Sequence, residues 1–182
     1  MKSMMKIMAA SALVWFAYSV AAAQAPPLTS TGSAQGKPRN DAASTVALRQ
    51  RQLDFMAAPI KSAKDLQAYL AKMPKALSPI EKLSPGAKKR FLDGLVFNEN
   101  GLVGYDYSDL AAELPASDVY RLMSLFGAQR TVPLISGLKV LGEQDALLIM
   151  YPDLGEDDHG DYRCIGGHNC VRTTGMICMT GC

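Results

Sequence analysis

The sequence is poor in several features that would point directly to a function. It has 182 residues with only two histidines and one tryptophan, and its 19 basic residues nearly balance its 17 acidic residues. A net charge of +2 gives no global field to attract nucleic acid or an anionic membrane. No apolar run is long enough to supply several membrane spans. What is left is the composition of an ordinary globular protein, 48% hydrophobic and 20% charged.

The short motifs that mark common enzymes are also missing. We find no G-x-S-x-G elbow, no H-E-x-x-H helix, no P-loop and no dinucleotide-binding fingerprint. No internal repeat of a solenoid period is visible. The sequence therefore predicts no cofactor, and an enzyme is the less favoured of the functional hypotheses.

The first 23 residues have the layout of a secretory signal peptide. Lys2 and Lys6 form a basic start, an apolar stretch follows, and small residues lead up to Ala23. We expect cleavage after Ala23, which would also remove Trp15 and leave 17 basic against 17 acidic residues. The alternative is an uncleaved anchor, but the apolar stretch is shorter than the roughly 20 residues of a spanning helix. The interpretation predicts a secreted or periplasmic protein without stable membrane insertion after cleavage.

A flexible linker is expected next, because residues 24–44 are mostly Pro, Gly, Ser, Thr, Ala and Gln and offer little apolar surface to bury. Helical periodicity begins after it. The first helix is expected to bury a stripe containing Val46, Leu53, Met56 and Ile60, which Leu48 and Phe55 widen.

Capping residues locate the helices that follow. Ser62 and Ser84 precede helical patterns, the second with Pro85 at the first helical position, and Ser78 begins a capping box over a short turn. A short helix over 108–114 and a better one capped by Ser117 or Asp118 are expected further on. The apolar run 146–151 predicts a buried strand or a short helix.

A hairpin interrupts the helical pattern between residues 95 and 107. The Asn100-Gly101 pair lies between two apolar segments and is typical of a tight turn that needs positive φ angles. The sequence thus predicts an α-rich α+β domain, with four or five short amphipathic helices around a small β-hairpin. We expect a helical core over 45–151 and a cysteine-rich tail over 152–182 that packs on the same domain.

The chemically distinctive residues gather in this tail. It contains both histidines, all four cysteines and an acidic cluster of Asp153, Glu156, Asp157, Asp158 and Asp161. In an exported protein, four closely spaced cysteines indicate two disulfides. Gly175 can close a turn midway between Cys170 and Cys178, which favours the nested pairing Cys170–Cys178 and Cys164–Cys182. Adjacent pairings stay open, because they satisfy the same Cα separation.

Two other interpretations of the tail remain. A metal site could use His159, His168, Asp157 and Asp161, although the paired C-x2-C knuckles of structural zinc sites are absent. A Cys164–His168 nucleophile pair is disfavoured because an oxidising compartment would capture the thiol as a disulfide. The loop Gly166, Gly167, His168 and Asn169 is instead predicted to project a fixed polar surface for binding.

Two functional hypotheses follow. The favoured one is a secreted or periplasmic binding protein, such as an inhibitor, an immunity-type protein or an envelope accessory factor, whose partner is another protein and not nucleic acid. The alternative is a small metal-dependent hydrolase built on His159, His168 and the acidic cluster, with a variant in which the tail is processed into a disulfide-rich secreted peptide.

Overall fold

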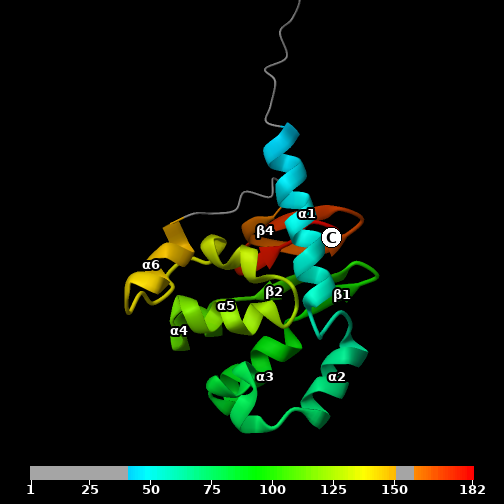
Figure 1. Ribbon diagram of the computed structural model, residues 1–182. Coiled ribbons are helices and arrows are strands. Elements are labelled where there is room, and N and C mark those ends of the chain that lie inside the picture. The colour runs from blue at the N-terminus through cyan, green and yellow to red at the C-terminus, as the bar shows by residue number, and fades with distance from the viewer. Residues whose placement is uncertain (1–40, 151–157) are drawn as a thin grey trace, which may run out of the picture. The chain divides into compact units, whose positions relative to one another are not determined.

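The computed structural model describes residues 41–150 and 158–182, with side chains from residue 45 onward (Figure 1). The expected signal peptide over 1–23 and most of the expected linker over 24–44 lie outside the described residues. Within the described ranges, no helix has the length and apolar character that crossing a bilayer requires.

The described residues form a helix-rich α+β domain, as predicted. The α-helices are α1 (Asp41–Ala57), α2 (Ala63–Lys72), α3 (Pro85–Asp93), α4 (Ser108–Glu113), α5 (Ala116–Ser124) and α6 (Glu143–Met150). Three 3-10 helices lie between them, η1 (Lys75–Leu77), η2 (Pro79–Lys82) and η3 (Gln129–Leu134). The strands are β1 (Val96–Asn98), β2 (Gly101–Asp106), β3 (His159–Gly166) and β4 (Asn169–Cys178).

Two of the predicted serine caps are confirmed. The hydroxyl of Ser62 accepts a hydrogen bond from the Asp65 amide at the start of α2, and that of Ser84 accepts one from the Ala87 amide at the start of α3. The predicted capping box at Ser78 is wrong, because its buried hydroxyl has no hydrogen-bond partner and only Pro79 at the first position of η2 fits the pattern.

The start of α5 differs from the prediction as well. Pro115 occupies the N-cap position, and no side chain within α5 caps the helix. The carboxylate of Asp145, in the first turn of α6, accepts the Ser117 amide at 2.7 Å instead. A residue distant in sequence thus supplies the N-terminal acceptor that α5 lacks.

Four antiparallel strands form one sheet in the order β1-β2-β4-β3. The predicted hairpin is confirmed as β1 and β2, with Glu99 and Asn100 as the turn and only Gly101 at a positive φ, +102°. The C-terminal tail supplies the other two strands, and Tyr105 of β2 pairs with Ile177 of β4. The tail is therefore half of the central sheet, and β4 is an inner strand.

The two faces of the sheet pack against different partners. Leu102, Tyr105 and Ile177 join the large core beneath the helices, whereas Val103 and Cys178 belong to a smaller cluster. A β-bulge between β1 and β2 makes this possible, because Phe97 pairs with Leu102 and its neighbour Val96 pairs with Gly104. The bulge shifts the alternation of β2, so that Leu102 and Tyr105 both face the large core although they are three residues apart.

The structure differs from the sequence-based expectation in the burial of two apolar segments. Along α1, most of the expected inward stripe is exposed, with Val46 at 69% and Met56 at 57% of their full accessibility. Phe55 is half-buried, and Ile60, beyond the helix end, is fully buried. Residues 146–150 form most of the helix α6, as the short-helix alternative predicted, and residue 151 lies outside the described residues. In this helix Leu147 and Met150 are exposed, and the buried residue is Asp145. In both segments the apolar residues are nearly continuous or widely scattered, so their periodicity did not identify the face that packs.

Candidate functional site

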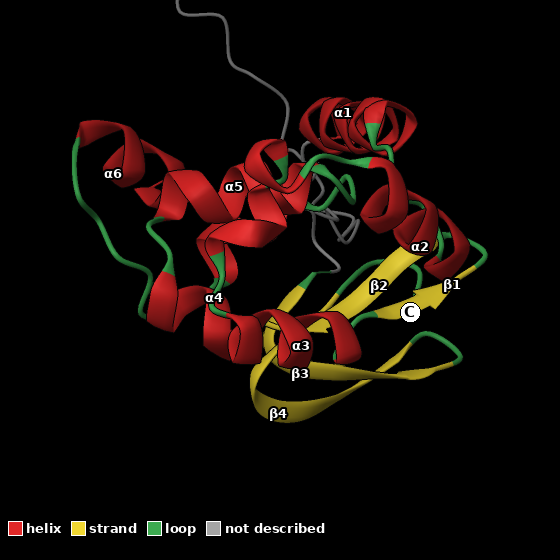
Figure 2. Cartoon of the chain, turned by 90° about the horizontal axis from the view of Figure 1, so that it is seen from below, coloured by secondary structure: helices red, strands yellow, loops and turns green. Residues whose placement is uncertain are grey.

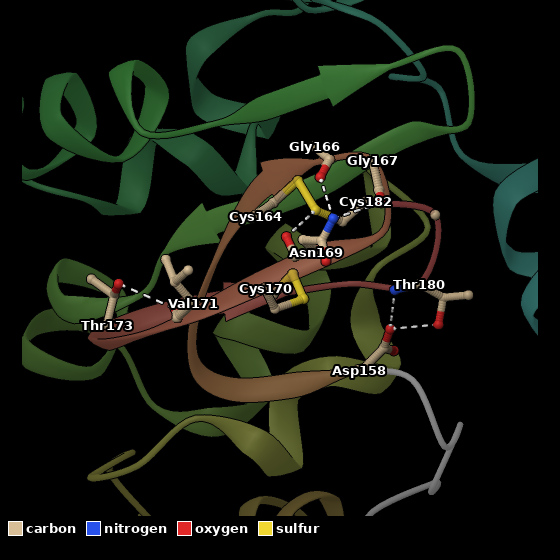
Figure 3. Close-up of a disulfide and its surroundings, with 12 residues drawn as sticks. Asp158, Cys164, Gly166, Gly167, Asn169, Cys170, Val171, Thr173, Thr180 and Cys182 are labelled. Carbon is tan, nitrogen blue, oxygen red and sulfur yellow. Dashed lines mark hydrogen bonds between the residues drawn. A yellow bond between two sulfur atoms is a disulfide. The ribbon is translucent and has the colours of Figure 1, made fainter.

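The disulfides follow the nested pairing expected from the sequence. Cys164 is bonded to Cys182 and Cys170 to Cys178, with Cα separations of 5.6 Å and 6.0 Å, and none of the four cysteines is free. Figure 3 shows both bonds beside the turn of the β3–β4 hairpin. Such bonds persist in oxidising environments and are rare in reducing ones.

These bonds fix a hairpin that bends back on itself. Gly160 of β3 pairs with Ile177 of β4, but the next pair is Tyr162 with Arg172. Residues 173–176 of β4 therefore bulge out opposite a single residue of β3, Asp161. Asp161 and Gly175 both have positive φ, +63° and +86°. We call residues 162–172 the hairpin tip and the paired segments around Gly160 and Ile177 the hairpin base. Figure 2 shows the resulting curl of β3 and β4.

The hairpin tip packs against the sheet face that the helices leave free. Tyr162, Cys164 and Cys170 contact the small cluster around Val103 and Cys178. Gly104 lies under this contact, where an added Cβ would come within 3.3 Å of the Cys164 Cβ and 3.1 Å of the Ile177 carbonyl oxygen. Both disulfides thus join the tip to the hairpin base and the C-terminal segment.

Asp161 holds the bend by hydrogen bonds. Its Oδ1 accepts from the Tyr107 hydroxyl at 2.6 Å and from the Gly175 amide at 3.0 Å. These two hydrogen bonds lower the pKa of Asp161 below its usual range; the bond from the Tyr107 hydroxyl has the larger effect and the bond from the Gly175 amide the smaller. Burial, with a smaller contribution from Asp161, raises the pKa of Tyr107. One oxygen of the carboxylate predicted as a metal ligand is therefore used in structural contacts.

The remaining acidic residues of the tail divide into two groups. Asp158 accepts two hydrogen bonds from Arg51 of α1, at 2.8 and 3.1 Å, and binds the Thr180 amide at 2.7 Å (Figure 3). It thereby ties α1 to the C-terminal segment. Asp153, Glu156 and Asp157 lie outside the described residues.

The two histidines are both exposed and lie in different parts of the hairpin. His159 lies in the hairpin base with its ring 5.4 Å from that of Tyr162, whereas His168 lies in the turn of the tip at a φ of +62°. Among the described residues, the only cluster of three or more potential metal-ligating side chains is formed by Cys164, Cys178 and Cys182, which are disulfide-bonded. The structure does not bring His159, His168 and Asp161 together.

The predicted binding loop forms the turn of the hairpin tip. Gly166 pairs with Asn169, and Gly167 and His168 both have a φ of +62°, as two-residue type I′ turns require. The Asn169 side-chain amide donates to the carbonyl oxygens of Gly166 and Gly167 at 3.4 and 2.8 Å (Figure 3). The loop is thus ordered by its own bonds and exposes the His168 imidazole.

An exposed apolar surface lies beside this loop, which sequence reasoning missed. Because side chains alternate along a strand, the residues next to the inward cysteines face outward. These are Arg163 and Val171, which lie directly opposite one another, and Ile165. Ile165 is 54% and Val171 39% exposed. We call Arg163, Ile165 and Val171 the outer tip face; alternation around the cysteines was the signal that could have identified it.

The outer edge of this face is a free strand edge within the described part of the chain. β3 is the terminal strand of the sheet. No described segment other than β4 donates to or accepts from the backbone of residues 162–165, and no described carboxylate forms an ion pair with Arg163. An edge strand that exposes backbone groups and apolar side chains is able to pair with another strand.

A second concave region lies between α1 and the C-terminal segment. It is a cleft of about 450 Å³ with walls from Leu48 and Phe55 of α1, the turn at Asn100, and Met179. Arg51, held by Asp158, forms part of one wall. Sequence reasoning missed this cleft too, because it depends on the packing of three segments distant in sequence.

Comparison with known proteins found no relative of this chain. No family model, no curated protein and no solved structure matches it.

Proposed function

We propose that this protein is a binding protein of the periplasm or the extracellular space, and that its partner is another protein. The carrying observation is the disulfide-fixed hairpin tip, which presents a free strand edge together with the outer tip face. Two disulfides and an expected signal peptide support an oxidising compartment. The absence of a recognisable catalytic motif in the sequence favours binding over catalysis.

The edge favours strand addition as the mode of binding. An extended segment of the partner would pair with β3 along residues 162–165, since main-chain hydrogen bonds give such complexes affinity and alternate side chains give specificity. Arg163 and Ile165 are alternate residues of that strand, so one would meet an acidic side chain and the other an apolar one. Fixing the strand by disulfides lowers the entropy lost on binding.

The alternatives receive less support. A hydrolase built on His159 and His168 would need these side chains and a carboxylate to converge, and Asp161 instead binds Tyr107 and Gly175. Release of the tail as a peptide would remove β4, an inner strand whose Ile177 is fully buried in the main core. The tail is therefore better suited to staying in the domain.

Substitution of the outer tip face tests the proposal. The protein is purified untagged from its native compartment, and bound proteins are quantified for the wild type, for Ile165→Asp combined with Val171→Asp, and for Leu77→Asp as control. Leu77 is 72% exposed on η1 and lies outside the tip. We expect one stoichiometric partner to be lost only from the double variant.

Two results would overturn the proposal. One is a partner that the double variant retains while its disulfides remain correctly paired. The other is a stoichiometric metal ion together with a hydrolytic activity that His159→Ala abolishes, which would establish the hydrolase alternative.

A further inference from the structure

Three sulfur atoms from different disulfides meet in the small cluster beneath the hairpin tip. The Sγ atoms of Cys164, Cys178 and Cys182 all lie within 4.8 Å of one another. Cys164 and Cys182 share one bond, whereas Cys178 belongs to the other. A thiolate released at Cys178 would therefore lie next to an intact disulfide.

The four cysteines differ in their access to solvent. Cys178 is fully buried and Cys182 is 7% exposed, whereas Cys164 and Cys170 are partly exposed. Exchange begins with attack of a thiolate on a disulfide sulfur, and the sulfur it can reach decides which thiolate leaves. An external thiol that attacks Cys170 releases the thiolate of Cys178 inside the sulfur cluster.

The strand register provides an end point for such an exchange. Cys164 and Cys170 are directly opposite one another in the hairpin tip, which is a separation that a disulfide can span. Cys178 and Cys182 are brought together by a turn in which the Cys182 amide donates to the Met179 carbonyl. The adjacent pairing Cys164–Cys170 with Cys178–Cys182 is thus within reach of the folded chain.

We propose that this cluster is a disulfide-exchange switch that detaches the hairpin tip. An external thiolate attacks the Cys170 Sγ, forming a mixed disulfide and releasing the Cys178 thiolate. That thiolate attacks the Cys182 Sγ, forming Cys178–Cys182 and releasing the Cys164 thiolate. The Cys164 thiolate attacks the Cys170 Sγ, forming Cys164–Cys170 and returning the external thiolate.

The sequence of steps needs no net oxidant or reductant. Two disulfides are present before and after, and the external thiol, of the class of glutathione or a protein thiol, acts as a catalyst. Both starting bonds join the tip to the rest of the domain, at Cys178 in the hairpin base and at Cys182 in the C-terminal segment. Of the product bonds, Cys164–Cys170 lies within the tip, and Cys178–Cys182 joins the base to the C-terminal segment without involving the tip. The exchange thus removes the covalent links between the tip and the rest of the domain. This proposal does not depend on what the tip binds.

Peptide mapping of the wild-type protein tests the switch. Arg163 and Arg172 are tryptic sites that separate the cysteines into peptides 164–172 and 173–182. The native bonds hold these peptides together, whereas the product bonds leave them separate, each with an internal disulfide. After incubation with a small amount of glutathione and alkylation, we expect separate peptides to accumulate. The rate should rise about tenfold per pH unit below the thiol pKa, near 8.5.

A matched pair of variants isolates the attacking sulfur. In Cys170→Ser the Cys178 thiol has no partner, and we expect it to displace the Cys164–Cys182 bond without added thiol at a rate independent of protein concentration. In Cys170→Ser combined with Cys178→Ser this thiol is gone, so the bond should stay intact.

The outcomes are distinct from those of the binding test. Retention of the Cys164–Cys182 bond in Cys170→Ser would overturn the switch. So would a wild-type protein that keeps only its native bonds, or that gives the same mixture of pairings in buffer as in concentrated urea. None of these results depends on a partner protein.

Discussion

At the scale of single residues, the tail shows why a sequence cluster of carboxylates and histidines is weak evidence for a metal site. Asp161 and Asp158 were candidates by proximity in sequence, yet each accepts hydrogen bonds that fix the backbone of the hairpin or the C-terminal segment. The partners, Tyr107 and Thr180, are distant from them in sequence. A local pattern contains the ligand type but not the competing donor, so the site could not be predicted from it.

The Tyr107–Asp161 hydrogen bond should make stability depend on pH. Because the pKa of Asp161 is lowered in the folded protein, its contribution is present above its unfolded pKa, about 4, and is lost as the pH falls through the folded pKa. Tyr107→Phe should cost about 1 kcal/mol at neutral pH, and the difference from wild type should shrink in acid. Urea unfolding at several pH values measures both.

Tyr105→Phe is the matched control for that prediction. Its hydroxyl is buried and lies 2.6 Å from the Thr131 hydroxyl, which is a neutral partner. Tyr105→Phe should also lower the free energy of unfolding by about 1 kcal/mol. This difference from the wild type should stay the same as the pH is lowered. Equal pH profiles for the two variants would mean that Asp161 does not contribute in the way described.

At the scale of elements, the sequence predicted helices where a cap and an apolar face agree. Ser62 and Ser84 begin helices whose Tyr69 and Phe91 are buried, and the Asn100-Gly101 pair marks the first hairpin. The sequence also indicated helices at α1 and α6, but not which of their residues are buried: most apolar residues of α1 are exposed, and those of α6 are half-buried or exposed. A helix that buries little apolar surface depends on specific polar contacts to stay on the domain. Hydrophobic periodicity does not predict which residues make such contacts.

Asp145 provides such a contact and predicts how α6 is held. It accepts the Leu141 amide at 2.8 Å and the Ser117 amide at 2.7 Å, and these bonds lower its pKa. Asp145→Ala should increase hydrogen exchange at both amides, whereas the inner strand β4 should exchange as in the wild type. Unchanged exchange at Ser117 would show that α5 does not depend on this carboxylate.

Gly175 allows a test of the bend in the hairpin. A left-handed residue other than glycine costs roughly 1–2 kcal/mol, and at Gly175 an added Cβ would also lie 2.5 Å from the Ser108 hydroxyl. Gly137 has a similar φ, +79°, with no atom within 4 Å of such a Cβ. Gly175→Ala should therefore lower the denaturation midpoint more than Gly137→Ala. Equal losses would mean that the bend yields to the added atom.

At the scale of the whole molecule, the fold depends on an association that no local pattern encodes. The sequence indicated the first hairpin and a turn between Cys170 and Cys178, but β2 pairs with β4, about seventy residues later, and that register joins the two hairpins into one sheet. The pairing of the cysteines was predictable in part because Gly175 allows a bend. The contact of the tip with the free sheet face, which creates the three-sulfur cluster, required the complete topology.

The two disulfides should contribute unequally to the stability of this assembly. The Cys164–Cys182 bond spans 18 residues and the Cys170–Cys178 bond spans 8, so loop-closure entropy gives about 3 and about 2.5 kcal/mol. Because the shorter loop lies inside the longer one, removing both should cost less than the sum. Replacing each pair by serines and measuring urea unfolding tests this order. Since the helices pack on the opposite face of the sheet, the far-ultraviolet helix signal should persist in both variants; its loss at the first replacement would mean that the helical core cannot form without the fixed hairpin.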